Sequence, residues 1–150
     1  MTKDVLLKIS GLHIGPDEVL QDGEAIEIIT PAQYYFKNGK HYVLYDEVGE
    51  NKNEITKNTL KFYDKYLSVT KTGYTNVQMI IEENKENITS YQTPMGALQV
   101  ALQGKNIVVD EKENNIMLSA NYGLAINFEH VADCRISMNI QSKDSRLNLG

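Results

Sequence analysis

The chain has no tryptophan, a single cysteine, three prolines and no long apolar run. One cysteine excludes a disulfide within the chain and is typical of reducing compartments, so the sequence predicts a cytoplasmic protein. The opening apolar run, Val5–Leu7, is too short for a signal peptide or a membrane-spanning segment, and lipidation motifs are absent. Because the prolines are spread out and no low-complexity linker divides the chain, one domain over residues 1–150 is expected.

Positive charge is also scarce. The 15 Lys and Arg residues face 20 Asp and Glu residues, giving a net charge of −5, and only Arg135 and Arg146 are arginines. This balance opposes non-specific binding to nucleic acid or to an anionic membrane. Two arginines provide few guanidinium groups for bidentate hydrogen bonds to phosphate or guanine. The composition therefore predicts neither a nucleic-acid partner nor a membrane partner.

Motifs that carry chemistry are missing as well. His13, His41 and His130 share no metal-ligand spacing, and no glycine-rich phosphate loop, G-x-S-x-G or C-x-x-C occurs. Acidic pairs such as Asp110-Glu111 fall near strand ends, where solvated turn charges explain them. Cys134 shares the phase of apolar residues and is expected to be a small buried hydrophobe. The sequence predicts no catalytic residue, no metal and no cofactor.

The sequence is rich in aromatic, β-favouring residues around Asn38-Gly39. Asn-Gly suits a type I′ turn, whose central residues both need φ > 0, so a β-hairpin is predicted from Tyr34 to Tyr45. A two-residue turn pairs Lys37 with Lys40, Phe36 with His41, Tyr35 with Tyr42 and Tyr34 with Val43. The face expected inside consists of Ala32, Tyr34, Phe36, His41, Val43 and Tyr45. The face expected outside consists of Gln33, Tyr35, Tyr42 and Leu44, with Lys37 and Lys40 at the tip.

Alternation of apolar and polar residues recurs along the chain and predicts strands with one buried face. The clearest stripes run over even positions from Ile116 to Phe128 and from Cys134 to Ile140. The residues predicted to be buried are Leu118, Tyr122, Leu124, Ile126, Ile136 and Met138. The one short helix expected is Pro16–Gln21. The pattern predicts an all-β fold, a single antiparallel up-and-down β-barrel of about 8–10 strands.

Several short segments, in a fairly specific order and spacing, span most of the chain: Lys3–Leu6, Ile9–Leu12, Tyr34–Tyr45, Thr59–Lys61, Gly73, Met79, Tyr91-x-Thr93-Pro94-x-Gly96-x-Leu98, Tyr122 and Leu124. In these segments the chain resembles the YwiB-like family, a bacterial family of unknown function. The resemblance implies a lipocalin-like, calycin-type β-barrel and brings no activity with it. Where similar proteins often carry arginine before the glycine of the middle turn, this chain has Lys71.

Inward tyrosines are the candidate ligand site. Nine tyrosines against three phenylalanines favour a lining with polar edges, because a buried hydroxyl needs a partner. The candidate residues are Tyr34, Tyr45, Tyr91 and Tyr122, with Lys71 at the rim for an anionic head group. Plain core packing with cross-strand aromatic pairs, each worth roughly 0.2–1 kcal/mol, is the alternative interpretation.

Three functions remain open from the sequence. The first is a barrel that binds a small apolar or amphipathic ligand in its interior. The second is a structural or protein-interaction module with a filled core, in which the outward Tyr35, Tyr42 and Leu44 contact a partner or a second copy as a homodimer. An enzyme ranks last, because no constellation of residues supports one.

Overall fold

The computed structural model describes residues 1–11, 27–73, 76–94 and 96–143, which form an all-β structure. None of these segments is a helix long and apolar enough to cross a membrane. The expected helix Pro16–Gln21 lies outside the described residues. The strands are β1 (Asp4–Ser10), β2 (Glu27–Lys37), β3 (Lys40–Val48), β4 (Ile55–Tyr63), β5 (Tyr66–Gly73), β6 (Val77–Glu82), β7 (Glu86–Thr93), β8 (Gly96–Glu111), β9 (Asn115–Ile126) and β10 (Glu129–Ser142).

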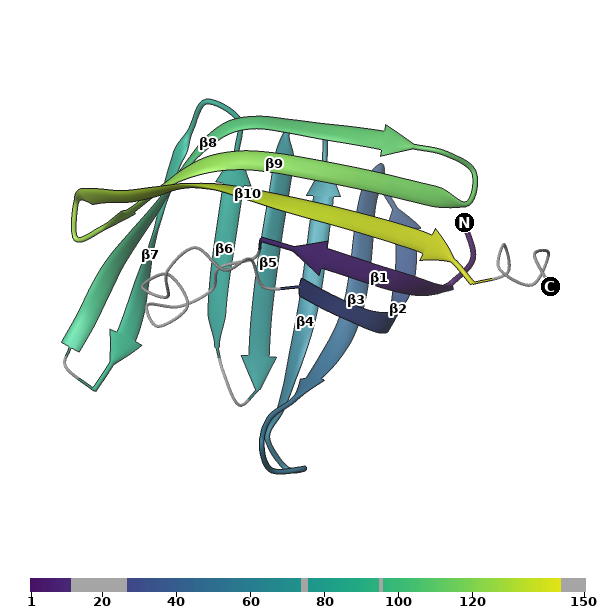
Figure 1. Ribbon diagram of the computed structural model, residues 1–150, viewed down its shortest axis with the longest axis horizontal. Coiled ribbons are helices and arrows are strands. Elements are labelled where there is room, and N and C mark those ends of the chain that lie inside the picture. The colour runs from purple at the N-terminus through teal and green to yellow at the C-terminus, as the bar shows by residue number, and fades with distance from the viewer. Residues whose placement is uncertain (12–26, 74–75, 95, 144–150) are drawn as a thin grey trace.

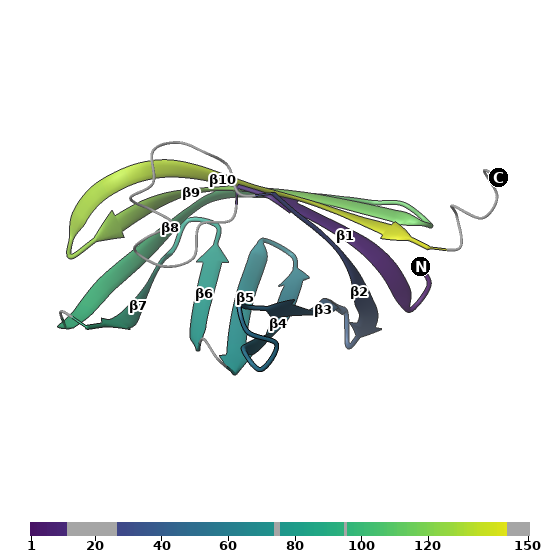
Figure 2. The same ribbon diagram turned by 60° about the horizontal axis from the view of Figure 1, so that its bottom comes forward.

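The ten strands form one antiparallel sheet in the order β6-β5-β4-β3-β2-β1-β10-β9-β8-β7. Every neighbour in this order is also a neighbour in sequence, except that β1 pairs with β10. The sheet curls so that the long strands β8–β10 lie across β3–β6 (Figures 1 and 2). The predicted all-β, up-and-down barrel is confirmed, and it is nearly closed.

The two edge strands, β6 and β7, meet at a seam without a ladder of backbone hydrogen bonds between them in the described residues. The turn that joins them, residues 83–85, docks instead on β8. Asn84 N donates to the Gly104 carbonyl at 3.0 Å, and Gly104 N donates to the Lys85 carbonyl at 2.9 Å. Thr89 Oγ1 donates to the Gln78 carbonyl across the seam at 2.9 Å. The barrel is therefore closed at this seam by a few separate hydrogen bonds and not by a continuous ladder.

The core lies on the inward phase of the strands, as the alternation predicts. Of the six predicted core residues, five are at most 3 % exposed: Leu118, Tyr122, Leu124, Ile136 and Met138. Ile126 is only partly buried, because it is the last residue of β9. The buried stripe also ends before Phe128, which is 80 % exposed. Asn127 and Phe128 both have positive φ and form the turn to β10.

The central hairpin has the predicted register, from Lys37 opposite Lys40 to Tyr34 opposite Val43. Asn38 and Gly39 have φ of 54° and 76°, as a type I′ turn requires. The inward face is buried with one exception: Phe36 is 59 % exposed. Phe36 is next to the turn residue pair at the rim of the barrel, where the sheet has no core to cover it.

Candidate functional site

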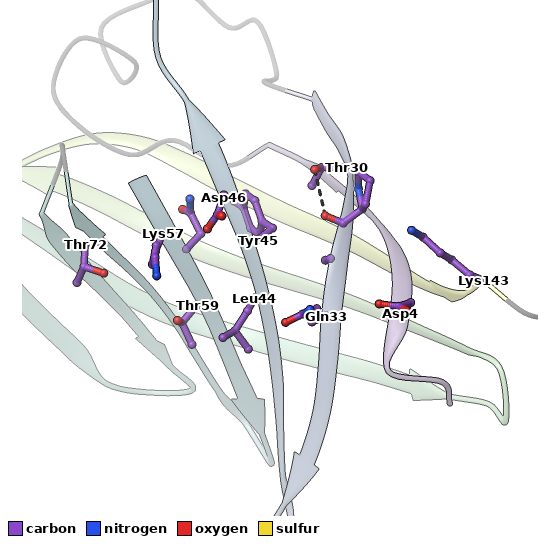
Figure 3. A pocket seen from close by; sticks show the side chains of 13 residues that line it. Asp4, Thr30, Gln33, Leu44, Tyr45, Asp46, Lys57, Thr59, Thr72 and Lys143 are labelled. Atoms are coloured by element: carbon purple, nitrogen blue, oxygen red, sulfur yellow. Dashed lines mark hydrogen bonds between the residues drawn. The ribbon is translucent and has the colours of Figure 1, made fainter. Parts of the chain in front are cut away.

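A split in the barrel wall lies between β2 and β3. The two strands pair only from Lys37/Lys40 to Gln33/Leu44, and beyond this point β2 pairs with β1 alone while β3 pairs with β4 alone. Pro31 lies in the diverging part of β2 and has no backbone N–H to extend a ladder. Figure 3 shows β2 and β3 meeting at the bottom and separating upward, with Thr30 on one side and Tyr45 and Asp46 on the other.

A hollow of about 640 Å³ occupies this split. Its lining comes mainly from β2 to β5 and mixes apolar and polar groups: Asp4, Thr30, Pro31, Ala32, Gln33, Leu44, Tyr45, Asp46, Lys57, Asn58, Thr59, Thr72 and Lys143. Its volume falls in the range of about 300–1,000 Å³ that is usual for small-molecule sites.

The inward face changes from apolar to polar at this level of the barrel. Tyr45, Asn58 and Lys71 are direct cross-strand partners on β3, β4 and β5. The row on one side is apolar and buried: Val43, Leu60 and Val69. The row on the other side begins with Glu47 opposite Thr56. Strand pairing therefore gathers a hydroxyl, an amide and an ammonium group at one end of an apolar interior.

Two atoms in this polar row are buried without a hydrogen-bond partner among the described residues, Tyr45 Oη and Asn58 Oδ1. Tyr45 is 5 % exposed and Asn58 is 1 % exposed. The amide nitrogen of Asn58 donates to the Thr56 carbonyl at 3.4 Å, which leaves the amide oxygen open. An unsatisfied buried polar group costs about 1–3 kcal/mol of stability, so such groups are rare in native proteins.

The charges of the row balance. Lys71 Nζ donates to Glu47 Oε1, and the Lys71 side chain is 11 % exposed. Burial, together with the negative charge of Glu47, raises the pKa of Tyr45. Tyr45 is therefore a neutral phenol whose proton is available for a hydrogen bond, and the expected cation at the barrel rim, Lys71, is already paired with the Glu47 carboxylate.

Tyr34 lies at the other end of the barrel, in a separate hollow of about 680 Å³. Its hydroxyl is 2.7 Å from His41 Nδ1, and His41 Nε2 is 3.4 Å from Glu111 Oε1. The His41 ring stacks on Phe62 with a centroid distance of 4.6 Å. This geometry fits a neutral imidazole that accepts a hydrogen bond from Tyr34 at Nδ1 and carries its proton on Nε2, the nitrogen nearer to Glu111.

The environment of this chain of groups keeps both Tyr34 and His41 uncharged. Burial, with a smaller effect from Glu111, raises the pKa of Tyr34 to about 12. Burial lowers the pKa of His41, and the nearby Glu111 carboxylate opposes that shift. The arrangement therefore stabilises the neutral, hydrogen-bonded forms rather than a tyrosinate or an imidazolium.

We expect the fold to lose stability on acidification because of His41. The unfolded chain binds a proton on this histidine at a higher pH than the folded chain does, so its contribution is present above about pH 6.5 and is lost as the pH falls below that value. Urea unfolding between pH 7 and pH 5 should show a smaller decline for His41→Gln than for the unchanged protein. The control is His130→Gln, since that side chain is 55 % exposed. Equal declines in all three proteins would contradict the expectation.

Tyr122 and Cys134 are cross-strand partners that line a third, smaller hollow of about 370 Å³. Burial raises the pKa of the Cys134 thiol, although a hydrogen bond with Tyr122 acts in the opposite direction. Cys134 packs against the core and is partly buried, which agrees with the expected hydrophobic role. Tyr91 lies on β7 opposite Leu98 and is also partly buried.

Of the five candidate ligand residues, only Tyr45 and Lys71 thus belong to one cluster, and the structure places Tyr34 and Tyr122 in other hollows. Asn58 and Glu47 complete the cluster, and neither was predicted as a site residue: Glu47 belongs to an acidic pair that was expected to be a solvated turn charge. The sequence does contain a signal for Asn58, because this polar residue lies on the buried side of β4 together with Thr56, Leu60 and Phe62. In the part of the chain that the structure describes, no group of three or more His, Cys, Asp or Glu side chains could hold a metal ion.

Comparisons with known proteins give a family and a fold. The family described as "Domain of unknown function (DUF1934)" matches residues 9–138. The crystal structure of ywiB protein from Bacillus subtilis is 21 % identical, covers 93 % of this chain and 92 % of its own, and has a TM-score of 0.71. No curated protein matches. Both matches confirm the resemblance drawn from the sequence, and the structural likeness shows the fold alone.

Proposed function

The chain belongs to the DUF1934 family of domains of unknown function, and from this premise we propose that it binds a small amphipathic molecule at the split between β2 and β3. One observation carries the proposal. Tyr45 Oη and Asn58 Oδ1 are buried without hydrogen-bond partners among the described residues, and both residues line the same hollow. Neither atom is accessible to water in the structure, so a molecule in the hollow reaches them only when the wall of the split opens. An acceptor for Tyr45 and a donor for Asn58 would then remove the cost of both groups.

The chemistry of the row favours an uncharged head group. Tyr45 donates and Asn58 Oδ1 accepts, so the complementary group carries an acceptor and a donor side by side, as a primary amide does. A carboxylate has no proton to offer Asn58, and it would meet Glu47, whose charge already acts on Tyr45. Because Glu47 balances Lys71, the anionic head group expected from Lys71 alone is replaced by a neutral one. Pro31, Ala32 and Leu44 supply apolar surface for a tail.

A lipocalin-like role is part of this proposal, since barrels of similar construction hold one small ligand. A cytoplasmic location is also proposed, because the one cysteine is a partly buried thiol that forms no disulfide. The alternative role, contact with a macromolecular partner, involves Tyr35 and Tyr42 on the outer side of the hairpin, which do not line the hollow, and Leu44, which does.

Calorimetric titration with octanamide and octanoate tests the head group. Both probes have the same tail, so a difference in affinity reports the polar contact. We expect octanamide to bind roughly fivefold more tightly, equivalent to about 1 kcal/mol for one hydrogen bond. Binding of neither probe would contradict the proposed site, and tighter binding of octanoate would contradict the neutral head group.

Replacing Tyr45 by phenylalanine should stabilise the unliganded protein by about 1 kcal/mol, because it deletes an unsatisfied buried hydroxyl and keeps the ring. The same change should weaken octanamide binding. Tyr34→Phe is the matched control, since it deletes a buried hydroxyl that is hydrogen-bonded to His41 and should therefore destabilise the fold. Urea unfolding of both variants gives the comparison. A loss of stability in Tyr45→Phe would mean that the hydroxyl has a structural role.

A further inference from the structure

The outer face of β2–β5 carries tyrosines and lysines in two neighbouring rows. In the first row Tyr35, Tyr42 and Lys61 are direct cross-strand partners. In the second row Tyr63 pairs with Tyr66, and Lys40 Nζ lies 4.9 Å from the centre of the Tyr63 ring. We call this surface the tyrosine–lysine face, made up of Tyr35, Lys40, Tyr42, Lys61, Tyr63 and Tyr66. It includes two of the three outward residues expected to contact a partner, and the third, Leu44, is next to it in the sheet.

The rings and ammonium groups on this face are in contact with one another. The Tyr63 and Tyr66 rings stack with centroids 4.7 Å apart and an interplanar angle of 21°. Lys61 Nζ lies 5.8 Å from the Tyr42 ring and 6.0 Å from those of Tyr63 and Tyr66. At the margin, Lys3 Nζ lies 5.5 Å from the Tyr35 ring. Each ring therefore has a cation near it, and each cation has a ring.

Among the described residues, no carboxylate forms an ion pair with the lysines of this face. Lys71, Lys85 and Lys105 form ion pairs with carboxylates, whereas Lys3, Lys40 and Lys61 form none with the described residues. Screening limits electrostatic interactions between exposed groups to about 8–10 Å, so the local charge matters more than the net charge of −5.

The hairpin tip adds a second, independent observation. Lys37 and Lys40 are directly opposite each other across β2 and β3. Like charges in this position destabilise a sheet, and a bound anion would remove the repulsion. An arrangement that breaks a local rule of stability is what is expected where a surface serves a function.

We propose that the tyrosine–lysine face binds single-stranded nucleic acid. Bases stack on tyrosine rings, and phosphates draw the lysine ammonium groups away from the rings that they now cover. Lysines with interleaved aromatic rings on a β-sheet are the combination that binds single strands without reading their sequence. This inference differs from the expectation of no nucleic-acid partner, which rests on the charge of the whole chain. A membrane fits less well, because the face offers rings with polar hydroxyls and few aliphatic side chains.

Fluorescence anisotropy with a labelled oligothymidylate of twelve nucleotides tests the proposal. Binding should weaken with salt, with a slope of log K against log salt of roughly −2 for three phosphate contacts at about 0.7 each. Because the chain has no tryptophan, its own fluorescence comes from tyrosine, and stacking of bases should quench it. The combined variant Lys40→Gln and Lys61→Gln should bind at least tenfold more weakly, with a shallower salt slope.

Two controls make the result specific. The variant Lys52→Gln and Lys112→Gln changes the net charge equally at exposed positions elsewhere, where neither lysine forms an ion pair with the described residues, and should bind like the unchanged protein. Tyr42→Leu keeps the charge, loses one ring, and should bind several-fold more weakly, while circular dichroism verifies its fold. The proposal is overturned if the oligonucleotide does not bind at low salt, if both double variants lose affinity equally, or if polyphosphate of the same charge binds as tightly. Binding to phosphatidylserine vesicles without binding to the oligonucleotide overturns it as well.

Discussion

Replacing Gly104 by alanine should cost the protein several kcal/mol and open the barrel at its seam. A Cβ at this position would lie 1.8 Å from the Glu82 carbonyl oxygen and 2.5 Å from the Glu82 carbonyl carbon. Both atoms belong to the backbone, so no side-chain rotation relieves the overlap. The turn between β6 and β7 has to move off β8, and the two hydrogen bonds that join Gly104 to Asn84 and Lys85 are then lost. We expect a loss of about 3 kcal/mol or more, at the upper end for a single substitution.

The measurement is the urea midpoint of Gly104→Ala against that of Gly39→Ala. Gly39 has a φ of 76° and nothing within 4 Å of the position of an added Cβ, so its substitution carries only the backbone strain of about 1–2 kcal/mol. Both substitutions add one methyl group, so the difference between their costs in unfolding free energy separates the effect of steric overlap from that of backbone strain. Equal costs, or a smaller cost at Gly104, would show that the β6–β7 turn does not need its contact with β8.

Patterns of alternating residues predicted the strands and their buried faces, but not where the strands end. The stripe from Ile116 continues to Phe128 in the sequence, yet the chain turns at Asn127 and Phe128, both with positive φ. No glycine or proline marks this turn, so its only sequence signal is one asparagine. The predicted burial of Phe36 is wrong for a related reason. Its phase is inward, but exposure at the rim depends on how far the neighbouring strands extend, which alternation within one strand does not report.

The candidate site was predictable only where it is local to a few paired strands. Tyr45 and Lys71 were predicted from their position in the alternating pattern of their strands. The structure brings them together because both pair with Asn58 on β4. The contact of His41 with Glu111 joins β3 to the end of β8, and the grouping of residues from distant strands depends on the curl of the whole sheet. The sequence also gave no sign that Gly104 meets the β6–β7 turn, because that contact joins segments that are not paired strands.

Replacing Leu124 by alanine should destabilise the fold by about 2–5 kcal/mol, because it leaves a cavity in a packed interior. Leu124 is 2 % exposed and is opposite Leu102, which is 1 % exposed, in the pairing of β9 with β8. Met117 lies on the same strand in the opposite phase and is 51 % exposed, so Met117→Ala should change stability by no more than about 0.5 kcal/mol. Urea unfolding of both variants tests the inward phase. A small cost for Leu124→Ala would mean that its neighbours already leave space there, as they would around a ligand cavity, since atoms that line a void have fewer contacts to lose.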